Sequence, residues 1–142
     1  KLIEMKNKSV FLIFAIIFML SCKKKEKNKP LNESFDKTGA TIISQSSFSS
    51  NAHPTEGCVR VYTKNGLKNL VFEGFKTDSG PDLRVYVSKT TGNGNFVDIG
   101  TLKSTSGNFY YSFDNSINTI EYKYVLIWCE DASVLFGNAL LQ

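Results

Sequence analysis

The residues that could carry redox or ligand chemistry are few: three cysteines and a single histidine, His53. One histidine in 142 residues excludes a multi-histidine metal site within one chain. Cys129 stands at the end of an apolar run, between Trp128 and Glu130. A redox thiol needs thiolate character and access, whereas Glu130 and Asp131 would raise its pKa by like-charge repulsion if they face it. Cys129 is therefore either a redox group or a small buried core residue, a common role for free cysteine.

Cys22 has a different context, because it follows a leader-like segment. We expect translation to begin at Met5, and an unbroken apolar run occupies residues 10–20. Such a run spans only about 16 Å as a helix, against about 30 Å of bilayer core, which favours a cleaved signal peptide over 1–21. The end of the run resembles a bacterial lipobox, although Met19 stands where leucine is usual. We therefore expect Cys22 to be lipidated, with palmitate as one acyl chain. The alternative is an ordinary signal peptide with a chance cysteine.

The basic charge of the chain belongs to its N-terminal part. Residues 1–21 carry a net +2, residues 23–29 carry five lysines and one glutamate, and residues 30–142 carry a net −2. We expect residues 22–38 to be a solvated tether, which either lies against anionic headgroups or acts only as a spacer. The remaining residues, 39–142, form an acidic domain. A nucleic-acid partner is excluded, because its only support was the overall charge of +4.

The domain shows a period of two rather than 3.6, which predicts strands. Residues 58–63 alternate, with Val59 and Val61 on one face, and Asn65-Gly66 predicts a tight turn. Further strands are expected at 67–75, 83–87, 96–99, 107–113, 122–129 and 134–141, the 122–129 strand being buried on both faces. Short strands with turn signals between them predict a single antiparallel β-sandwich or barrel-like domain.

The sequence leaves open whether Cys58 and Cys129 form a disulfide. A secreted compartment permits disulfides, and lipidation would remove Cys22 from the pool of free thiols. If the two strands were neighbours, a bridge closing about 70 residues could stabilise the fold by roughly 2–4 kcal/mol. It would also remove Cys129 as a free redox thiol or ligand.

Several strings, in this order and spacing, resemble the DM-thirteen domain, also called the electron-transfer DM domain. They are Gly80-Pro81-Asp82-Leu83-Arg84-Val85-Tyr86-Val87-Ser88, Asp98-Ile99-Gly100-Thr101-Leu102-Lys103, Ser106-Gly107-Asn108-Phe109-Tyr110-Tyr111, Val125-Leu126-Ile127-Trp128-Cys129-Glu130 and Val134-Leu135-Phe136-Gly137-Asn138-Ala139-Leu140. Upstream, Ala52-His53-Pro54-Thr55-Glu56-Gly57 is similar to the start of the family's first strands. The resemblance covers about residues 45–142, essentially the whole expected domain.

The resemblance implies a role in electron transfer or oxidative modification at cell surfaces. The implied role rests on the characteristic cysteine of the family, which falls on Cys129. This cysteine would act either as a bare thiol or by holding a prosthetic group. In animals the domain accompanies DOMON domains, which are thought to bind haem. The family carries a histidine near His53, so His53 and Cys129 are the implied ligands if haem or a metal binds. The alternative for His53 is a surface loop residue. Covalent c-type haem is excluded, because no Cys-x-x-Cys-His string exists.

Two other features favour structural roles. Gly80-Pro81-Asp82 has the composition of a turn, and cation binding by Asp78 and Asp82 lacks the spacing of a calcium loop, so no metal site is firm. Trp128 could line a ligand face, but aromatic residues in strands more often belong to the core.

No nucleophile elbow, phosphate loop or metal triad is present. We expect a non-catalytic, lipid-anchored module of the bacterial cell envelope, facing the periplasm or the exterior, with a redox role through Cys129 and an unidentified protein or redox partner. The alternative is a ligand- or protein-binding module in which Cys129 is structural.

Overall fold

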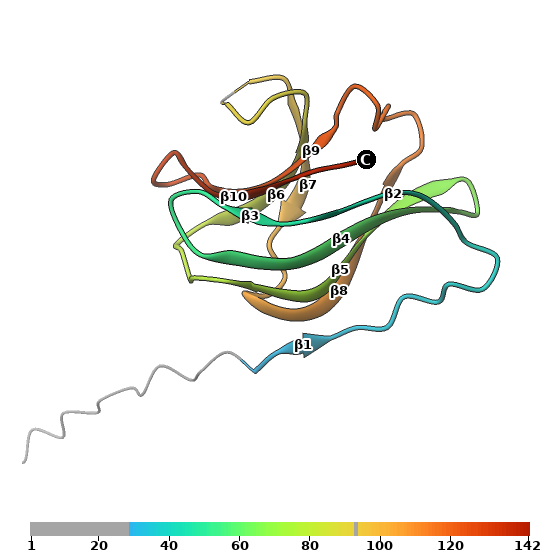
Figure 1. Cartoon of the computed structure of the whole chain (residues 1–142), viewed down its shortest axis with the longest axis horizontal. Helices are drawn as coiled ribbons and strands as arrows, with labels where there is room; N and C mark the ends of the chain where they lie inside the picture. The colour runs from blue at the N-terminus through green and yellow to red at the C-terminus, as the bar shows by residue number, and fades with distance from the viewer. Residues whose placement is uncertain (1–28, 93) are drawn as a thin grey trace, which may run out of the picture.

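The computed structural model describes residues 29–92 and 94–142 (Figure 1). The expected signal peptide, the expected lipidation site at Cys22 and most of the lysine run lie outside the described residues. The strands are β1 (Leu31–Asn32), β2 (Thr41–Ser47), β3 (Ser49–Ser50), β4 (Thr55–Lys64), β5 (Leu67–Thr77), β6 (Leu83–Ser88), β7 (Phe96–Thr101), β8 (Ser106–Asp114), β9 (Tyr124–Cys129) and β10 (Val134–Leu140). Within the described part of the chain, no helix is long and apolar enough to cross a bilayer.

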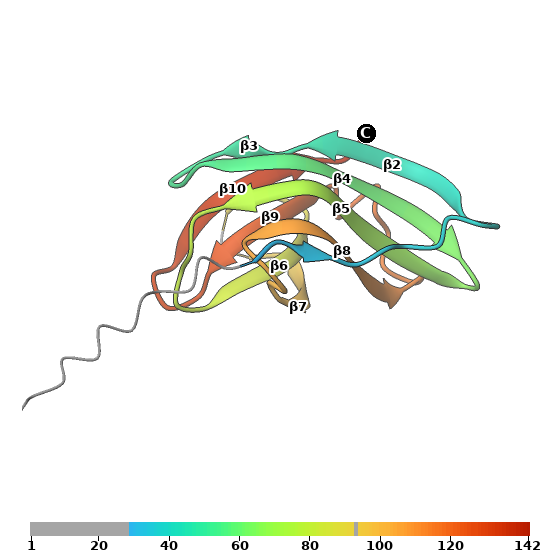
Figure 2. The ribbon, with the colours of Figure 1, turned by 90° about the horizontal axis from the view of Figure 1, so that it is seen from below.

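The strands form two five-stranded sheets that pack face to face. Sheet one has the order β1-β8-β5-β4-β2, and sheet two has the order β3-β10-β9-β6-β7. Neighbouring strands are antiparallel except for β1, which runs parallel to β8. The two layers are visible in Figure 2, and the prediction of an all-β sandwich is confirmed.

Alternation along the strands explains which side chains fill the core. In β4, Val59 and Val61 are fully buried between the sheets, as their spacing predicts. Strand β9 is buried on both faces, because Val125 and Ile127 enter the main core while Leu126 joins a second cluster on the outer face of sheet two. The sequence therefore identified the central strand of sheet two, although β9 begins at Tyr124 rather than at residue 122.

The turn between β4 and β5 follows the predicted Asn-Gly chemistry. Asn65 has φ 50° and Gly66 has φ 74°, which are the positive values that a tight hairpin turn of this kind requires. The turn sets the register in which Lys64 pairs with Leu67, and the pairing then continues along both strands.

One side of the sandwich is closed by a segment that passes from sheet one to sheet two. Strand β2 pairs with β4 in sheet one, and after Phe48 the chain continues as β3, which pairs with β10 in sheet two. Near the end of the chain, the backbone groups of Gln45 and Gln142 bond to each other in both directions, at 3.1 and 3.3 Å. The fold is thus barrel-like on this side.

The N-terminal boundary of the domain differs from the expected one at residue 39. Residues 31–38, here named the strap, lie against sheet one instead of forming a free tether. Strand β1 pairs with β8, Leu31 packs against the main core, and the Phe35 ring lies near the rings of Tyr62 and Tyr110. In the sequence, the two apolar residues of the strap are separated by polar ones, so the segment resembles the tether that precedes it.

Candidate functional site

Cys129 is the last residue of β9 and is completely buried. It pairs with Leu83 of β6 and Val134 of β10, and its side chain belongs to the main core cluster. Its neighbour Glu130 is exposed, and the Glu130 N–H donates to the Asp82 carbonyl at 2.9 Å. Cys129 lines neither the cavity beside Cys58 nor the smaller ones beside Phe35, Ile42 and Gly80. The thiol is therefore shielded from solutes by close-packed apolar side chains.

His53 lies at the surface, in the loop before β4. Its Nδ1 atom is 3.0 Å from Oδ2 of Asp78, and its ring stacks on Phe136 with centroids 3.8 Å apart. The side chain is 38% exposed. Phe136 is itself buried in the core cluster that contains Cys129. The His53 ring thus covers an aromatic core residue from outside, and its Nδ1 is already engaged by a carboxylate.

The two implied haem or metal ligands do not share a binding space. Cys129 faces the core, His53 stacks on the outside of Phe136, and neither residue lines any of these four cavities. Within residues 29–92 and 94–142, no group of three or more metal-ligating side chains comes together. The arrangement does not fit a haem held between these two residues.

The third cysteine, Cys58, lies on β4 with the alternation opposite to Val59 and Val61, so its side chain faces away from the core. Both Cys58 and Cys129 are free thiols. They belong to different sheets, and the layer of sheet one separates the outward-facing Cys58 from the core. The disulfide that the sequence left open is therefore not formed in this structure.

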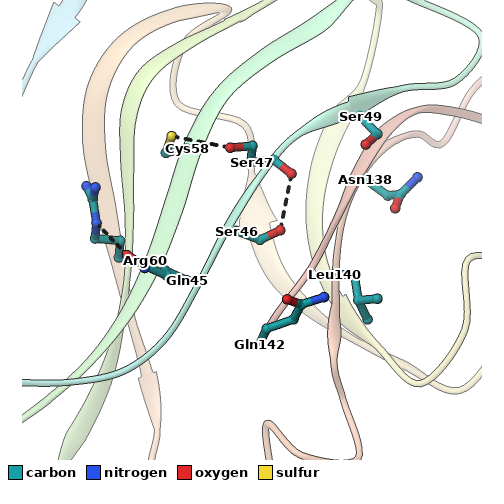
Figure 3. Close-up of a pocket in the computed structure, with 9 residues that line it drawn as sticks. All are labelled: Gln45, Ser46, Ser47, Ser49, Cys58, Arg60, Asn138, Leu140 and Gln142. Atoms are coloured by element: carbon teal, nitrogen blue, oxygen red, sulfur yellow. Dashed lines mark hydrogen bonds between the residues drawn. The ribbon is translucent and has the colours of Figure 1, made fainter.

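Cys58 lines a cavity with a volume of about 550 Å³ (Figure 3). Its Sγ is 3.7 Å from Oγ of Ser47, which lies directly opposite on β2. Across the cavity, Asn138 and Leu140 come from β10. Polar side chains dominate the wall, which is formed by Gln45, Ser46, Ser47, Ser49, Cys58, Arg60, Asn138, Leu140 and Gln142.

The charge in this cavity wall is neutralised within the fold. Arg60 is the one charged residue of the wall; it forms an ion pair with Glu73 of β5, and its Nε donates to Oε1 of Gln45 at 3.3 Å.

Sequence reasoning missed the cavity because β2 and β10 are far apart in the chain. The only local signal was the run of small polar residues at 44–47.

The Gly80-Pro81-Asp82 segment forms the turn between β5 and β6. A Cβ at Gly80 would lie 2.9 Å from the Leu83 side chain and 3.1 Å from the Phe136 ring, so the chain needs glycine to pass this close to the core. The Asp82 carboxylate lies 4.0 Å from the Arg84 guanidinium, and its carbonyl receives the Glu130 N–H. These contacts give the turn a structural role.

Trp128 lies on the outer face of sheet two, where it packs with Tyr86 and Leu126 and is only 8% exposed. Its environment is that of a core residue on a second, smaller cluster. It does not line the cavity beside Cys58 or the smaller ones beside Phe35, Ile42 and Gly80.

The architecture defines an all-β sandwich module with one cysteine, Cys129, buried at the end of a central strand. The family model described as "Electron transfer DM13" matches residues 47–141, well over half of the chain. The chain belongs to this electron-transfer family. No curated protein and no solved structure matches it significantly. The match begins after the strap, which is therefore outside the part that the family model covers.

Proposed function

We propose that this protein is an electron-transfer module of the bacterial cell envelope, held at a membrane by a lipid on Cys22. The family match over residues 47–141 supports the electron-transfer role and is the observation that carries the proposal. The lipobox-like end of the leader and the lysine run after it support the anchoring. The partner would be an unidentified redox protein or other electron carrier at the membrane.

Cys129 is the proposed redox residue, because the characteristic cysteine of the family falls there. Its complete burial limits how it can act. A soluble oxidant cannot contact the thiol while the core is closed, since reactivity needs both access and thiolate character. Electron exchange with Cys129 would therefore proceed through packed protein or after local opening of the loops around Asp82 and Glu130.

A second candidate function is binding without redox chemistry, with Cys129 as a core residue. Two observations favour it: the thiol is 0% exposed, and a cavity of about 550 Å³ lies elsewhere, beside Cys58. The polar wall of that cavity suits a small polar ligand rather than an apolar one.

Film voltammetry of the mature protein on an electrode separates the two functions. The electron-transfer proposal expects a reversible signal that persists in Cys58→Ser and is lost in Cys129→Ala. Visible absorption of the purified protein runs in parallel, because a Soret band lost in His53→Ala or Cys129→Ser would reveal haem.

Absence of any signal from the folded protein would reject the electron-transfer role of this chain. A signal that survives in Cys129→Ala and disappears in Cys58→Ser would keep the role but move the redox group to the cavity.

The anchor is tested by fractionation of cells that express the full chain. We expect wild-type protein in the membrane fraction and Cys22→Ala in the soluble fraction. Membrane association that survives Cys22→Ala would show that lipidation does not hold the protein.

A further inference from the structure

The strap is bound to sheet one by an alternating set of contacts. Leu31, Glu33 and Phe35 are half-buried, while Asn32 and Ser34 between them are exposed. Leu31 pairs with Gly107 of β8, and the Glu33 N–H donates to the Asn108 carbonyl at 2.8 Å. The strap therefore continues sheet one as an edge strand with one face directed toward the protein.

Aromatic packing fixes the middle of the strap. The Phe35 ring lies between Tyr62 of β4 and Tyr110 of β8, with centroid distances of 5.4 and 5.3 Å. The ammonium of Lys64 lies 5.8 Å from the centroid of the Phe35 ring. Because β8 and β4 flank β5 in sheet one, Phe35 marks where the strap crosses the outer face of the sheet.

Ion pairs follow the same path across the sheet. Glu33 accepts from Lys103 at 2.9 Å, Asp36 accepts from Lys64 at 2.8 Å, and Lys37 donates to Glu73 at 2.9 Å. The Lys103 ammonium holds the pKa of the Glu33 carboxyl below its ordinary value. Each exposed pair contributes little alone, but three pairs in sequence define one register for the strap.

Gly107 permits the closest approach between the strap and sheet one. It has φ 120°, and a Cβ on this residue would overlap the backbone of Leu31. A residue with a side chain at this position would displace the start of the strap, so the sheet is shaped to receive it.

The strap begins at one particular end of the sandwich, here named the loop end, which carries residues 51–54, 77–82, 102–105 and 130–133. Leu31 pairs with Gly107, beside the Thr105 carbonyl that receives the Thr77 N–H. In Figure 2 the arrows of β5 and β9 point toward this end. The strap then runs toward the opposite end, where its Asp36 meets Lys64.

We propose that the strap is an orienting device, which holds the loop end toward the membrane that carries Cys22. Eight residues lie between Cys22 and Leu31, and the nine Cα–Cα steps that join the two reach no more than about 32 Å when fully extended. The His53–Asp78 pair and the end of β9 with Cys129 both lie at the loop end. This inference rests on the proposed anchoring, and it places the partner of the redox region at the membrane surface rather than in the bulk compartment.

The test measures which end of the domain lies near the bilayer. Single reporter cysteines replace exposed residues at the loop end (Ser79→Cys) and at the opposite end (Asn115→Cys), both in a Cys58→Ser background. The lipoprotein from cells expressing the full chain is labelled with a fluorophore and placed in phosphatidylethanolamine–phosphatidylglycerol vesicles with a headgroup quencher. We expect several-fold stronger quenching at position 79 than at position 115.

Strap variants show whether this asymmetry depends on the strap. The double variant Glu33→Ala/Phe35→Ala should equalise the quenching at the two positions, whereas Ser34→Ala, whose side chain points to solvent, should leave it unchanged. Circular dichroism and the midpoint of thermal unfolding confirm that the double variant is folded. Equal quenching in the intact protein, or an asymmetry that the folded double variant retains, would overturn the proposal.

A second arm separates the orientation from the anchor. A mature chain with Cys22→Ala and a hexahistidine tag before residue 22 is held on nickel-chelating vesicles, so that lipidation is not needed. Asymmetry in this arm together with no vesicle binding by the natural protein would reject the lipid anchor but support the orienting strap. Loss of asymmetry in this arm would reject the strap whatever holds the natural protein.

Discussion

Replacing Gly107 with alanine should destabilise the protein more than the same change at another strained glycine. Gly107 and Gly100 have similar backbone conformations, with φ 120° and 137°, so alanine at either position costs about 1–3 kcal/mol of backbone strain. The two sites differ in their surroundings: a Cβ at Gly100 meets nothing within 4 Å, whereas a Cβ at Gly107 overlaps Leu31. Gly100→Ala is therefore the matched control for strain alone.

The additional loss in Gly107→Ala is the stabilisation that the strap contributes. Release of the strap breaks its backbone hydrogen bonds to β8, worth about 1 kcal/mol each, and the aromatic contacts of Phe35, worth about 0.5–1.5 kcal/mol. The freed strap regains conformational entropy, which offsets part of the loss. We expect a net difference of about 2 kcal/mol between the two variants in the free energy of unfolding.

Urea unfolding followed by the fluorescence of Trp128 measures this difference. Trp128 is the only tryptophan and lies on sheet two, away from the strap, so it reports global unfolding in both variants. Equal free energies of unfolding for Gly107→Ala and Gly100→Ala would refute the reasoning, because the strap would then contribute nothing to stability.

Three further predictions concern titration and thiol reactivity. The pKa of Glu33 is lowered in the folded state, so its stabilising effect is complete above the ordinary value of 4.5 and is lost as the pH falls through the lower folded value. The protection of the Glu33 amide against hydrogen exchange, relative to the intrinsic exchange rate at the same pH, should therefore fall in acid. Burial raises the pKa of Tyr111 to about 12, so stability should fall as the pH rises from 10 toward 12, a loss that Tyr111→Phe should reduce in alkaline unfolding curves. In the native protein, a thiol reagent should modify Cys58 rapidly and Cys129 only in denaturant; modification of Cys129 at the native rate of Cys58 would contradict its burial.

Local patterns in the sequence accounted for most of the sandwich. The alternation around Val59 and Val61 located β4 and its buried face, and Asn65-Gly66 located the first hairpin turn. The apolar run that ends at Cys129 also predicted a strand buried on both faces, and the burial of Cys129 follows from it. These features depend on neighbours in sequence, which is why they could be read from it.

The cavity and the strap could not be predicted in the same way. The cavity exists because β2 passes β10, a contact between segments about 90 residues apart. The strap depends on single contacts of Leu31 and Phe35 with a sheet formed much later in the chain. Neither β2 nor the strap has enough apolar residues to produce a periodic signal, so only the tertiary structure reveals the partner of each.

The strap also affects how this protein avoids self-association. Strand β1 pairs with Gly107 and Asn108 of β8, so without the strap β8 would be the open edge of sheet one over its whole length and could pair with another molecule. A fragment limited to residues 47–141 would lose the strap and β2 together, leaving both β8 and β4 as open edges. The segment before the family domain therefore also limits strand-to-strand association at the edge of sheet one, in addition to stabilising the fold.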